Sequence, residues 1–135
     1  MLLVDTNVLL DVVTNDPIWA DWSQRQLEKL AFRARLAVNP IVYAELSIGY
    51  ERIEDVEAIL DTTGVEIEEI PRAALFLAGK TFREYRARGG TKTGVLSDFF
   101  IGAHAVVAGI GLLTRDTRRY RSYFPTIVLI TPGDA

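Results

Sequence analysis

The sequence predicts an α/β fold: a three-layer α/β/α sandwich around a mainly parallel five-stranded sheet. Short runs of aliphatic and β-branched residues recur along the chain, and longer amphipathic stretches separate them. These stretches are long enough to serve as crossover helices between parallel strands. With 135 residues, 49% of them hydrophobic, the chain is expected to form one domain, residues 1–135, around a single core.

The expected strands are short apolar segments. The first is the run Leu2, Leu3 and Val4, and the third alternates in polarity and ends at Pro71. The five predicted strands are residues 2–4, 36–38, 65–70, 111–114 and 126–130.

The expected helices follow residues that commonly cap a helix or proline at a first helical position. One helix is expected to end at Gly64, since glycine readily adopts the left-handed conformation there. The predicted N-caps are Asn7, Asp16, Asn39 and Ser97. The predicted helices begin near residues 8, 17, 40, 53, 73 and 97.

The composition excludes several kinds of site. The chain has no cysteine, which rules out disulfides, thiol catalysis and cysteine zinc sites. Its single histidine, His104, cannot form a histidine metal site, and we expect it at the edge of the core or partly exposed. No apolar run approaches the roughly 20 residues of a membrane span, so we expect a cytoplasmic protein that does not bind membranes.

Charge is distributed unevenly along the chain. The net charge is −3, but residues 1–79 carry −8 and residues 80–121 carry +6. Twelve of the fifteen cations are arginine, whose planar fork suits phosphate. Any one arginine is adequately explained as part of a solvated helix face, whereas the asymmetry as a whole indicates contact with a polyanion.

Four acids fall where the predicted strands end or helices begin: Asp5, Glu45, Asp98 and Asp116. Parallel strands present their carboxyl ends at one edge of the sheet, so these acids are expected to meet there. Taken singly, Asp5, Asp98 and Asp116 could be ordinary turn or helix-start acids. Glu45 is harder to explain in that way, because its neighbours on the helix are mostly apolar.

Four carboxylates in one site would repel each other and raise one another's pKa. A hard divalent cation, Mg²⁺ or Mn²⁺, would resolve the repulsion, since it prefers oxygen ligands and commonly recruits a substrate phosphate. The residues therefore predict metal-assisted phosphodiester chemistry.

Four segments resemble those of a known family. They are the stretch from Val4 to Leu10, the lone Glu45 after Asn39 and Pro40, the stretch from Leu96 to Ala105, and the stretch from Leu113 to Thr117 followed by Arg121, Phe124 and Pro125. In this order they are similar to PIN-domain proteins, specifically VapC-type toxins. The resemblance implies a PIN-like fold and a Mg²⁺-dependent endoribonuclease. It also implies a homodimer that a cognate VapB-type antitoxin inhibits.

Within this hypothesis the four acids hold one or two metal ions and carry the catalysis. Thr6 and Asn7 would orient a ligand or water through hydrogen bonds. The RNA backbone would be bound by Arg115, Arg118, Arg119, Arg121 and Lys92.

Dimerisation has an additional motivation in the sequence. The middle helices carry more apolar surface than one sheet face needs, through Tyr43, Ile48, Tyr50, Ile53 and Ile59. Either these helices pack on each other or they form a self-complementary patch.

Two other functions remain open. An aspartyl-nucleophile phosphohydrolase also places an acid after its first strand, but it needs a second acid two residues later, where this chain has Asn7, and a suitably placed lysine. A non-catalytic RNA- or protein-binding module could keep the same fold.

Overall fold

The computed structural model describes residues 1–133 and has one five-stranded sheet. All four strand pairings are parallel, and the spatial order is β3-β2-β1-β4-β5. The strands are β1 (Leu2–Val4), β2 (Leu36–Val38), β3 (Glu66–Ile67), β4 (Gly111–Leu113) and β5 (Leu129–Ile130). The predicted α/β class and five-stranded sheet are confirmed.

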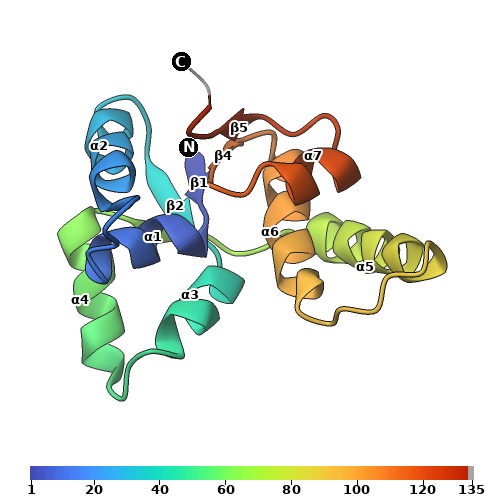
Figure 1. The fold of residues 1–135 in the computed structure, drawn as a ribbon, viewed down its shortest axis with the longest axis horizontal. Coiled ribbons are helices and arrows are strands. Elements are labelled where there is room, and N and C mark those ends of the chain that lie inside the picture. Colours follow the sequence, from blue (N-terminus) through green and yellow to red (C-terminus); the bar gives the residue numbers. More distant parts are fainter. Residues whose placement is uncertain (134–135) are drawn as a thin grey trace.

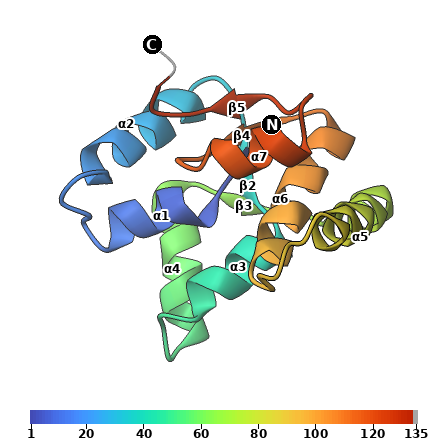
Figure 2. The same cartoon turned by 45° about the vertical axis from the view of Figure 1, so that its right-hand side comes forward.

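Helices cover both faces of the sheet. Helices α1, α2 and α4 lie on one side and α5 and α6 on the other (Figures 1 and 2), which gives the predicted three layers. The helices within residues 1–133 are α1 (Thr6–Val13), α2 (Ala20–Ala31), α3 (Pro40–Ser47), α4 (Ile53–Thr63), α5 (Arg72–Ala87), α6 (Val95–Ala108) and α7 (Arg118–Tyr123). None of them is long and apolar enough to cross a membrane.

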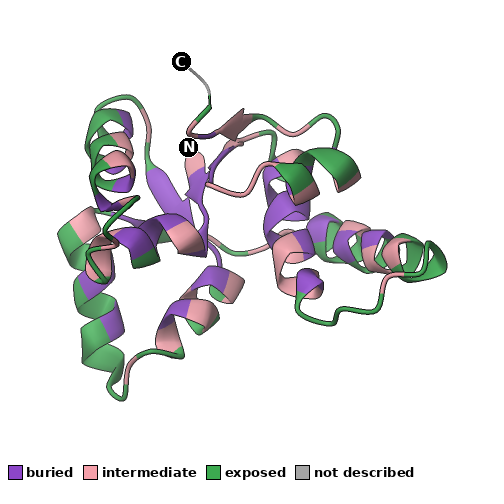
Figure 3. Ribbon diagram, in the orientation of Figure 1, coloured by how far each residue is buried: buried purple, intermediate pink, exposed green. Residues whose placement is uncertain are grey.

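The core lies between the sheet and its helices. Figure 3 shows the central strands and the inward sides of α1 and α6 as buried, whereas the outer sides of α4 and α5 are exposed. Leu3, Val38 and Leu112 from three neighbouring strands are fully buried. A parallel sheet covered on both faces accounts for these continuous apolar strands.

Three of the four predicted caps differ from the structure, and Asn7 and Ser97 are the first two. The N-cap of α1 is Asp5, not Asn7, because Asp5 keeps an extended backbone and its side chain accepts a hydrogen bond from the Thr6 amide. Ser97 lies inside the first turn of α6, which begins at Val95 after Gly94 without a side-chain cap. The prediction that Ser97 caps this helix is therefore wrong.

Of the other two predicted caps, Asn39 forms and Asp16 does not. Asn39 accepts hydrogen bonds from the Ile41 and Val42 amides, which confirms it as the N-cap of α3. The prediction that Asp16 caps the next helix is wrong. Asp16 accepts hydrogen bonds from the amides of Ile18 and Trp19 within a turn, and α2 begins only at Ala20, after Trp19.

The edge strand β3 is shorter than predicted. The alternating pattern predicted a strand over residues 65–70, whereas only Glu66 and Ile67 form one, and both are exposed. This strand pairs with β2 alone, and β2 has three residues, so few backbone partners are available on that side. The helix before it ends at Gly64 in the left-handed conformation, as predicted.

Candidate metal-dependent nuclease site

The centre of the candidate site is the carboxyl edge of the sheet, where β1 and β4 lie side by side. Asp5 follows β1 directly, and Thr114 follows β4 directly. In the order β3-β2-β1-β4-β5, the chain passes from β1 to β2 and β3 on one side of β1, and from β4 to β5 on the other side. Open parallel sheets bind ligands at the point where the strand order reverses, which here lies between β1 and β4.

Asp5 is buried, with 4% of its surface exposed, and its carboxylate is held on both oxygens. Oδ1 accepts from the Thr6 amide at 2.8 Å. Oδ2 accepts from the Thr114 hydroxyl at 2.7 Å and the Tyr120 hydroxyl at 2.9 Å, and the Asn7 amide lies 3.3 Å from it. This network fixes the orientation of the carboxylate and leaves Oδ1 able to accept a further ligand.

The pKa of Asp5 is raised to about 6. Burial is the largest cause, and the charge of Asp98 adds to it. The hydrogen bonds from Thr114, Tyr120 and the Thr6 amide act in the opposite direction, since they stabilise the carboxylate. Asp5 thus titrates within reach of neutral pH.

Glu45 reaches the same edge from α3. Its Oε1 accepts a hydrogen bond of 2.7 Å from the Thr6 hydroxyl, which links it to the helix that Asp5 caps. Burial raises the pKa of Glu45, and the charge of Asp98 contributes to the increase. The apolar neighbours of Glu45 indicated a constrained acid, and Thr6 is the partner that constrains it.

Asp98 and Asp116 are joined by one arginine. Arg119 donates from Nη1 to Asp98 Oδ2, and the same nitrogen lies 4.0 Å from Asp116 Oδ2. Burial raises the pKa of Asp98 in spite of this ion pair, and the charge of Asp116 raises it further. Asp98 is electrostatically coupled to Asp5, Glu45 and Asp116.

The four acids thus belong to one electrostatic neighbourhood, although they come from four segments of the chain. Their donor set consists of carboxylate oxygens, the ligands that Mg²⁺ and Mn²⁺ prefer. Within residues 1–133 no three acids or histidines lie close enough together to hold an ion in their present positions. The residues fit a hard divalent ion in chemistry, and binding would require their side chains to draw together.

Thr114 and Tyr120 belong to the site, although the sequence reasoning gave neither a role there. Both are buried, and both donate to Asp5 Oδ2. Thr114 also accepts from the Asp116 amide at 3.0 Å, so one hydroxyl connects Asp5 with the loop that carries Asp116. The position of Thr114 directly after a strand was an available signal, whereas nothing near Tyr120 in the sequence points to Asp5.

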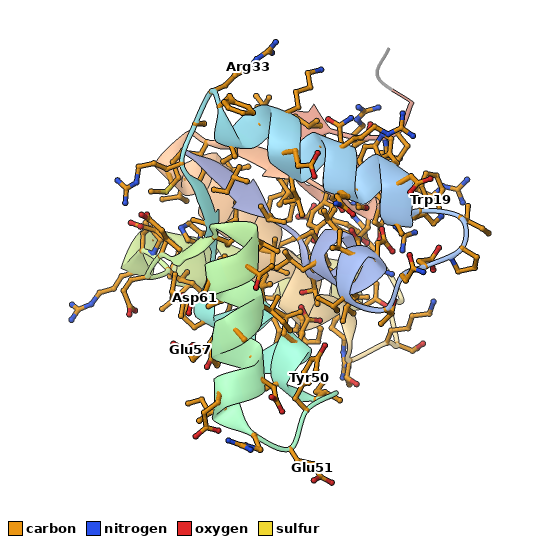
Figure 4. The ribbon with its side chains drawn as sticks, turned by 90° about the vertical axis from the view of Figure 1, so that its left-hand side faces the viewer. Trp19, Arg33, Tyr50, Glu51, Glu57 and Asp61 are labelled. Atoms are coloured by element: carbon orange, nitrogen blue, oxygen red, sulfur yellow. The ribbon has the colours of Figure 1, made fainter. Side chains whose placement is uncertain are left out.

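Arg115 was predicted to bind RNA, and the structure places its guanidinium on another side chain. Its Nε and Nη2 donate to the buried Asp11 at 2.6 and 2.8 Å. The guanidinium also lies 5.2 Å from the centre of the Trp19 ring, and Figure 4 shows Trp19 at the start of α2. Ser23 donates to the same carboxylate at 2.6 Å. Arg115 therefore ties the loop after β4 to α1 and α2.

The other predicted RNA-binding cations lie at the surface. Arg118 and Arg121 are exposed on α7, and Lys92 is exposed in the loop between α5 and α6. The Tyr85 hydroxyl accepts a hydrogen bond of 3.0 Å from the Lys92 amide, which holds the loop against α5. These positions leave the role predicted for the three side chains open.

His104 is more deeply buried than expected. Only 1% of its surface is exposed, and its Nδ1 lies 3.3 Å from the Asn39 side-chain amide. Burial lowers its pKa, which favours the neutral ring. The expectation of an edge position is wrong: His104 packs in the core and braces the cap of α3.

The apolar residues of the middle helices are partly exposed. Ile48 and Ile53 are 87% and 65% exposed, whereas Ile59 is buried against the core. An open groove of about 570 Å³ lies between α3 and α4, and Glu57 and Asp61 on its rim project from α4 in Figure 4. Of the predicted patch, Ile48 and Ile53 are thus available at the surface, whereas Tyr43 and Tyr50 are partly buried against the core.

Comparison with solved structures shows the same architecture in other proteins. VapBC2 from Rickettsia felis bound to a DNA fragment from its promoter superposes with a TM-score of 0.72 at 24% identity, covering 96% of this chain and 97% of that one. A toxin–antitoxin complex from Klebsiella pneumoniae gives a TM-score of 0.69 at 22% identity, covering 98% of both chains. VapBC-1 from nontypeable Haemophilus influenzae gives 0.70 at 20% identity, covering 96% of both chains.

Sequence comparison identifies the family. No curated protein matches the chain significantly. The PIN domain family matches residues 2–124, the segment that contains all four acids and both hydroxyls on Asp5. The chain therefore belongs to the PIN domain family.

Proposed function

We propose that this protein is a divalent-metal-dependent endoribonuclease and the toxin component of a VapBC-type toxin–antitoxin system. The observation that supports the nuclease activity is the position of Asp98 beside the other acids at one sheet edge, where Arg119 lies between it and Asp116 and where its charge acts on Asp5 and Glu45. Burial raises the pKa of Asp5, Glu45 and Asp98, and repulsion between the acids adds to it, so a shared cation would stabilise their charged forms. The toxin assignment is supported by the similarity in fold to toxin–antitoxin complexes.

In this proposal Asp5, Glu45, Asp98 and Asp116 hold Mg²⁺ or Mn²⁺. The bound ion would supply charge to activate a water and to stabilise the leaving oxygen of a phosphodiester. Thr6 orients Glu45, and Thr114 with Tyr120 orients Asp5. Asn7 donates toward Asp5 and accepts from the Arg115 amide, which fixes the distance between α1 and the loop after β4.

Cations near this edge would bind the RNA backbone. Arg118, Arg121 and Lys92 are exposed, Arg118 lines a surface pocket with Asp116, and Arg119 lies between Asp98 and Asp116. RNA binding should weaken as salt rises, because phosphate contacts release counterions. A salt-independent affinity would exclude these side chains from the interface.

The partners in this proposal are an RNA substrate, a VapB-type antitoxin and a second copy of the chain in a homodimer. The exposed Ile48 and Ile53 are the apolar surface available for dimerisation, and the outer parts of the half-buried Tyr43 and Tyr50 adjoin the same helices. Sedimentation at micromolar concentration should show a dimer. If only the monomer is found, the proposed homodimer is rejected. A cytoplasmic location is part of the same proposal.

The decisive experiment compares Asp98→Asn with a matched control. With Mg²⁺ or Mn²⁺ the protein should cleave single-stranded RNA, and Asp98→Asn should abolish cleavage while the far-UV circular dichroism stays unchanged. Asp21→Asn removes the same charge from an exposed position on α2 and should cleave normally. Retained metal-dependent cleavage by Asp98→Asn would reject the site. Release of phosphate from small esters would favour a phosphohydrolase, and RNA binding without cleavage would favour a binding module.

A further inference from the structure

Arg119 occupies an unusual position for a cation predicted to face RNA. It lies on α7 next to Tyr120, which is buried and hydrogen-bonded to Asp5. Its Nη1 donates to Asp98 and lies 4.0 Å from Asp116, so its charge sits between two of the acids proposed to hold the metal ion. The backbone that carries Arg119 is thus anchored in the site, and only its long side chain is free to change direction.

The ion pair places one positive charge of the chain's own beside two of the four acids. Asp98 is coupled electrostatically to the other three acids, so a cation placed on Asp98 relieves repulsion throughout the cluster. Arginine keeps its charge at all relevant pH values, so it cannot yield to another cation by losing a proton. It can yield only by moving away.

We propose that Arg119 is an internal counter-ion of the site, and that a divalent ion gains Asp98 only in exchange for the Arg119 guanidinium. This inference rests on the proposed function, since it concerns the same four acids. It accounts for the observation that the acids are coupled but not gathered closely enough to hold an ion in their present positions. The side chain is 32% exposed, so the guanidinium can turn into solvent without unfolding α7.

The released guanidinium would then be available to the substrate. It carries a fork of donors that matches a phosphate and would lie beside the ion that needs the same phosphate. Metal binding and phosphate binding would therefore be coupled through one side chain, each favouring the other.

Calorimetric titration with Mn²⁺ alone, without RNA, tests the exchange. Arg119→Gln removes the competing charge and should tighten Mn²⁺ binding by about fivefold or more relative to the unaltered chain. Arg83→Gln is the matched control, since it removes the same charge from an exposed position of α5 that has no part in the site, and it should change the affinity less than twofold. A second readout is the Arg119 side-chain Nε–H signal in a ¹⁵N-labelled sample, which should shift on addition of Mg²⁺ as the ion pair with Asp98 breaks.

The outcomes separate the two proposals. Equal Mn²⁺ affinity for both variants, with an unmoved Arg119 signal, would overturn the exchange and leave the metal site standing. Absence of Mn²⁺ binding by the unaltered chain and by Arg119→Gln would overturn the metal site and the exchange with it. Tighter binding only in Arg119→Gln, with a shifted signal, supports the exchange.

Discussion

The Tyr120 hydroxyl donates a 2.9 Å hydrogen bond to Asp5 Oδ2 across a sequence separation of 115 residues. Both side chains are buried, and the Thr114 hydroxyl joins the same oxygen. The proposed metal ligand at the start of the chain is therefore oriented by residues near its end. Burial and the nearby acids, Asp5 foremost, raise the pKa of Tyr120 well above its ordinary value, so the phenol stays protonated and remains a donor.

The raised pKa of Asp5 predicts that the metal-free protein loses stability as pH rises. In the folded state Asp5 titrates near 6, compared with 3.8 when exposed, so the native state binds the proton more tightly than the unfolded state. Between about pH 4 and pH 6 this group should lower the free energy of unfolding by about 3 kcal/mol. Urea unfolding should show that the free energy of unfolding falls more between pH 4.5 and pH 7 for the unaltered chain than for Asp5→Asn. An equal fall in both proteins would contradict the claim that burial destabilises the charged form of Asp5.

Thr114→Val should raise the pKa of Asp5 beyond its present value. The substitution keeps the shape of the side chain and removes the hydrogen bond that most favours the charged form. It also leaves the Asp116 amide without its acceptor, so we expect a loss of about 1–3 kcal/mol in stability. A carboxyl NMR titration measures the pKa directly. As control, Thr81→Val removes a buried hydroxyl that only donates to Leu77 within α5, and it should leave the Asp5 titration in place.

Arg115→Ala should destabilise the fold by about 3 kcal/mol or more, because it strands the charge of Asp11, whose side chain is 3% exposed. Ser23 alone would remain as its partner. Arg35→Ala is the comparison. Its ion pair with Glu66 is exposed on both sides, so its loss should change the free energy of unfolding far less. Denaturant unfolding of both variants gives the difference. Similar losses would show that Arg115 does not fasten the loop after β4.

Gly102→Ala should be destabilising although it lies in a helix. A Cβ at this position would lie 2.5 Å from Phe124 and 3.1 Å from Tyr120, in a core that has no room for it. We expect a loss of about 1–3 kcal/mol and weaker Mn²⁺ binding, because Tyr120 would be displaced from Asp5. Gly79→Ala in α5 meets nothing within 4 Å and should gain about 0.5–1 kcal/mol. Thermal unfolding and calorimetry measure both effects, and a stabilised Gly102→Ala would refute the packing argument.

The fold could be predicted from the sequence to a large extent. Strand and helix patterns are local, and parallel topology follows from the spacing of strands by helices. The same rule brought Asp5 and Asp116 to one edge, because each follows a strand that ends there. Glu45 could be recognised because its neighbours on the same helix are mostly apolar, and this pattern is visible in the local sequence.

The details that the sequence did not reveal depend on long-range partners or on backbone angles. Asn7 and Ser97 are residue types that often cap helices. The N-cap of α1 is nevertheless Asp5, which has an extended backbone, and α6 begins before Ser97. No feature of the sequence indicated that Arg115 pairs with Asp11, because the two residues are far apart along the chain and only the fold brings them together. Hydrogen bonds such as that of Tyr120 join residues whose proximity only the folded chain creates.

The dependence of Asp5 on Thr114 and Tyr120 has a consequence in time. During synthesis Asp5 is added to the chain well before the hydroxyls that orient it, which follow 109 and 115 residues later. Since domains generally fold as units during synthesis, a partly made chain would contain Asp5 without the hydrogen bonds from Thr114 and Tyr120 that orient its carboxylate. Any activity of the proposed site would thus begin only after the segment that contains Thr114 and Tyr120 has been added and has folded against Asp5.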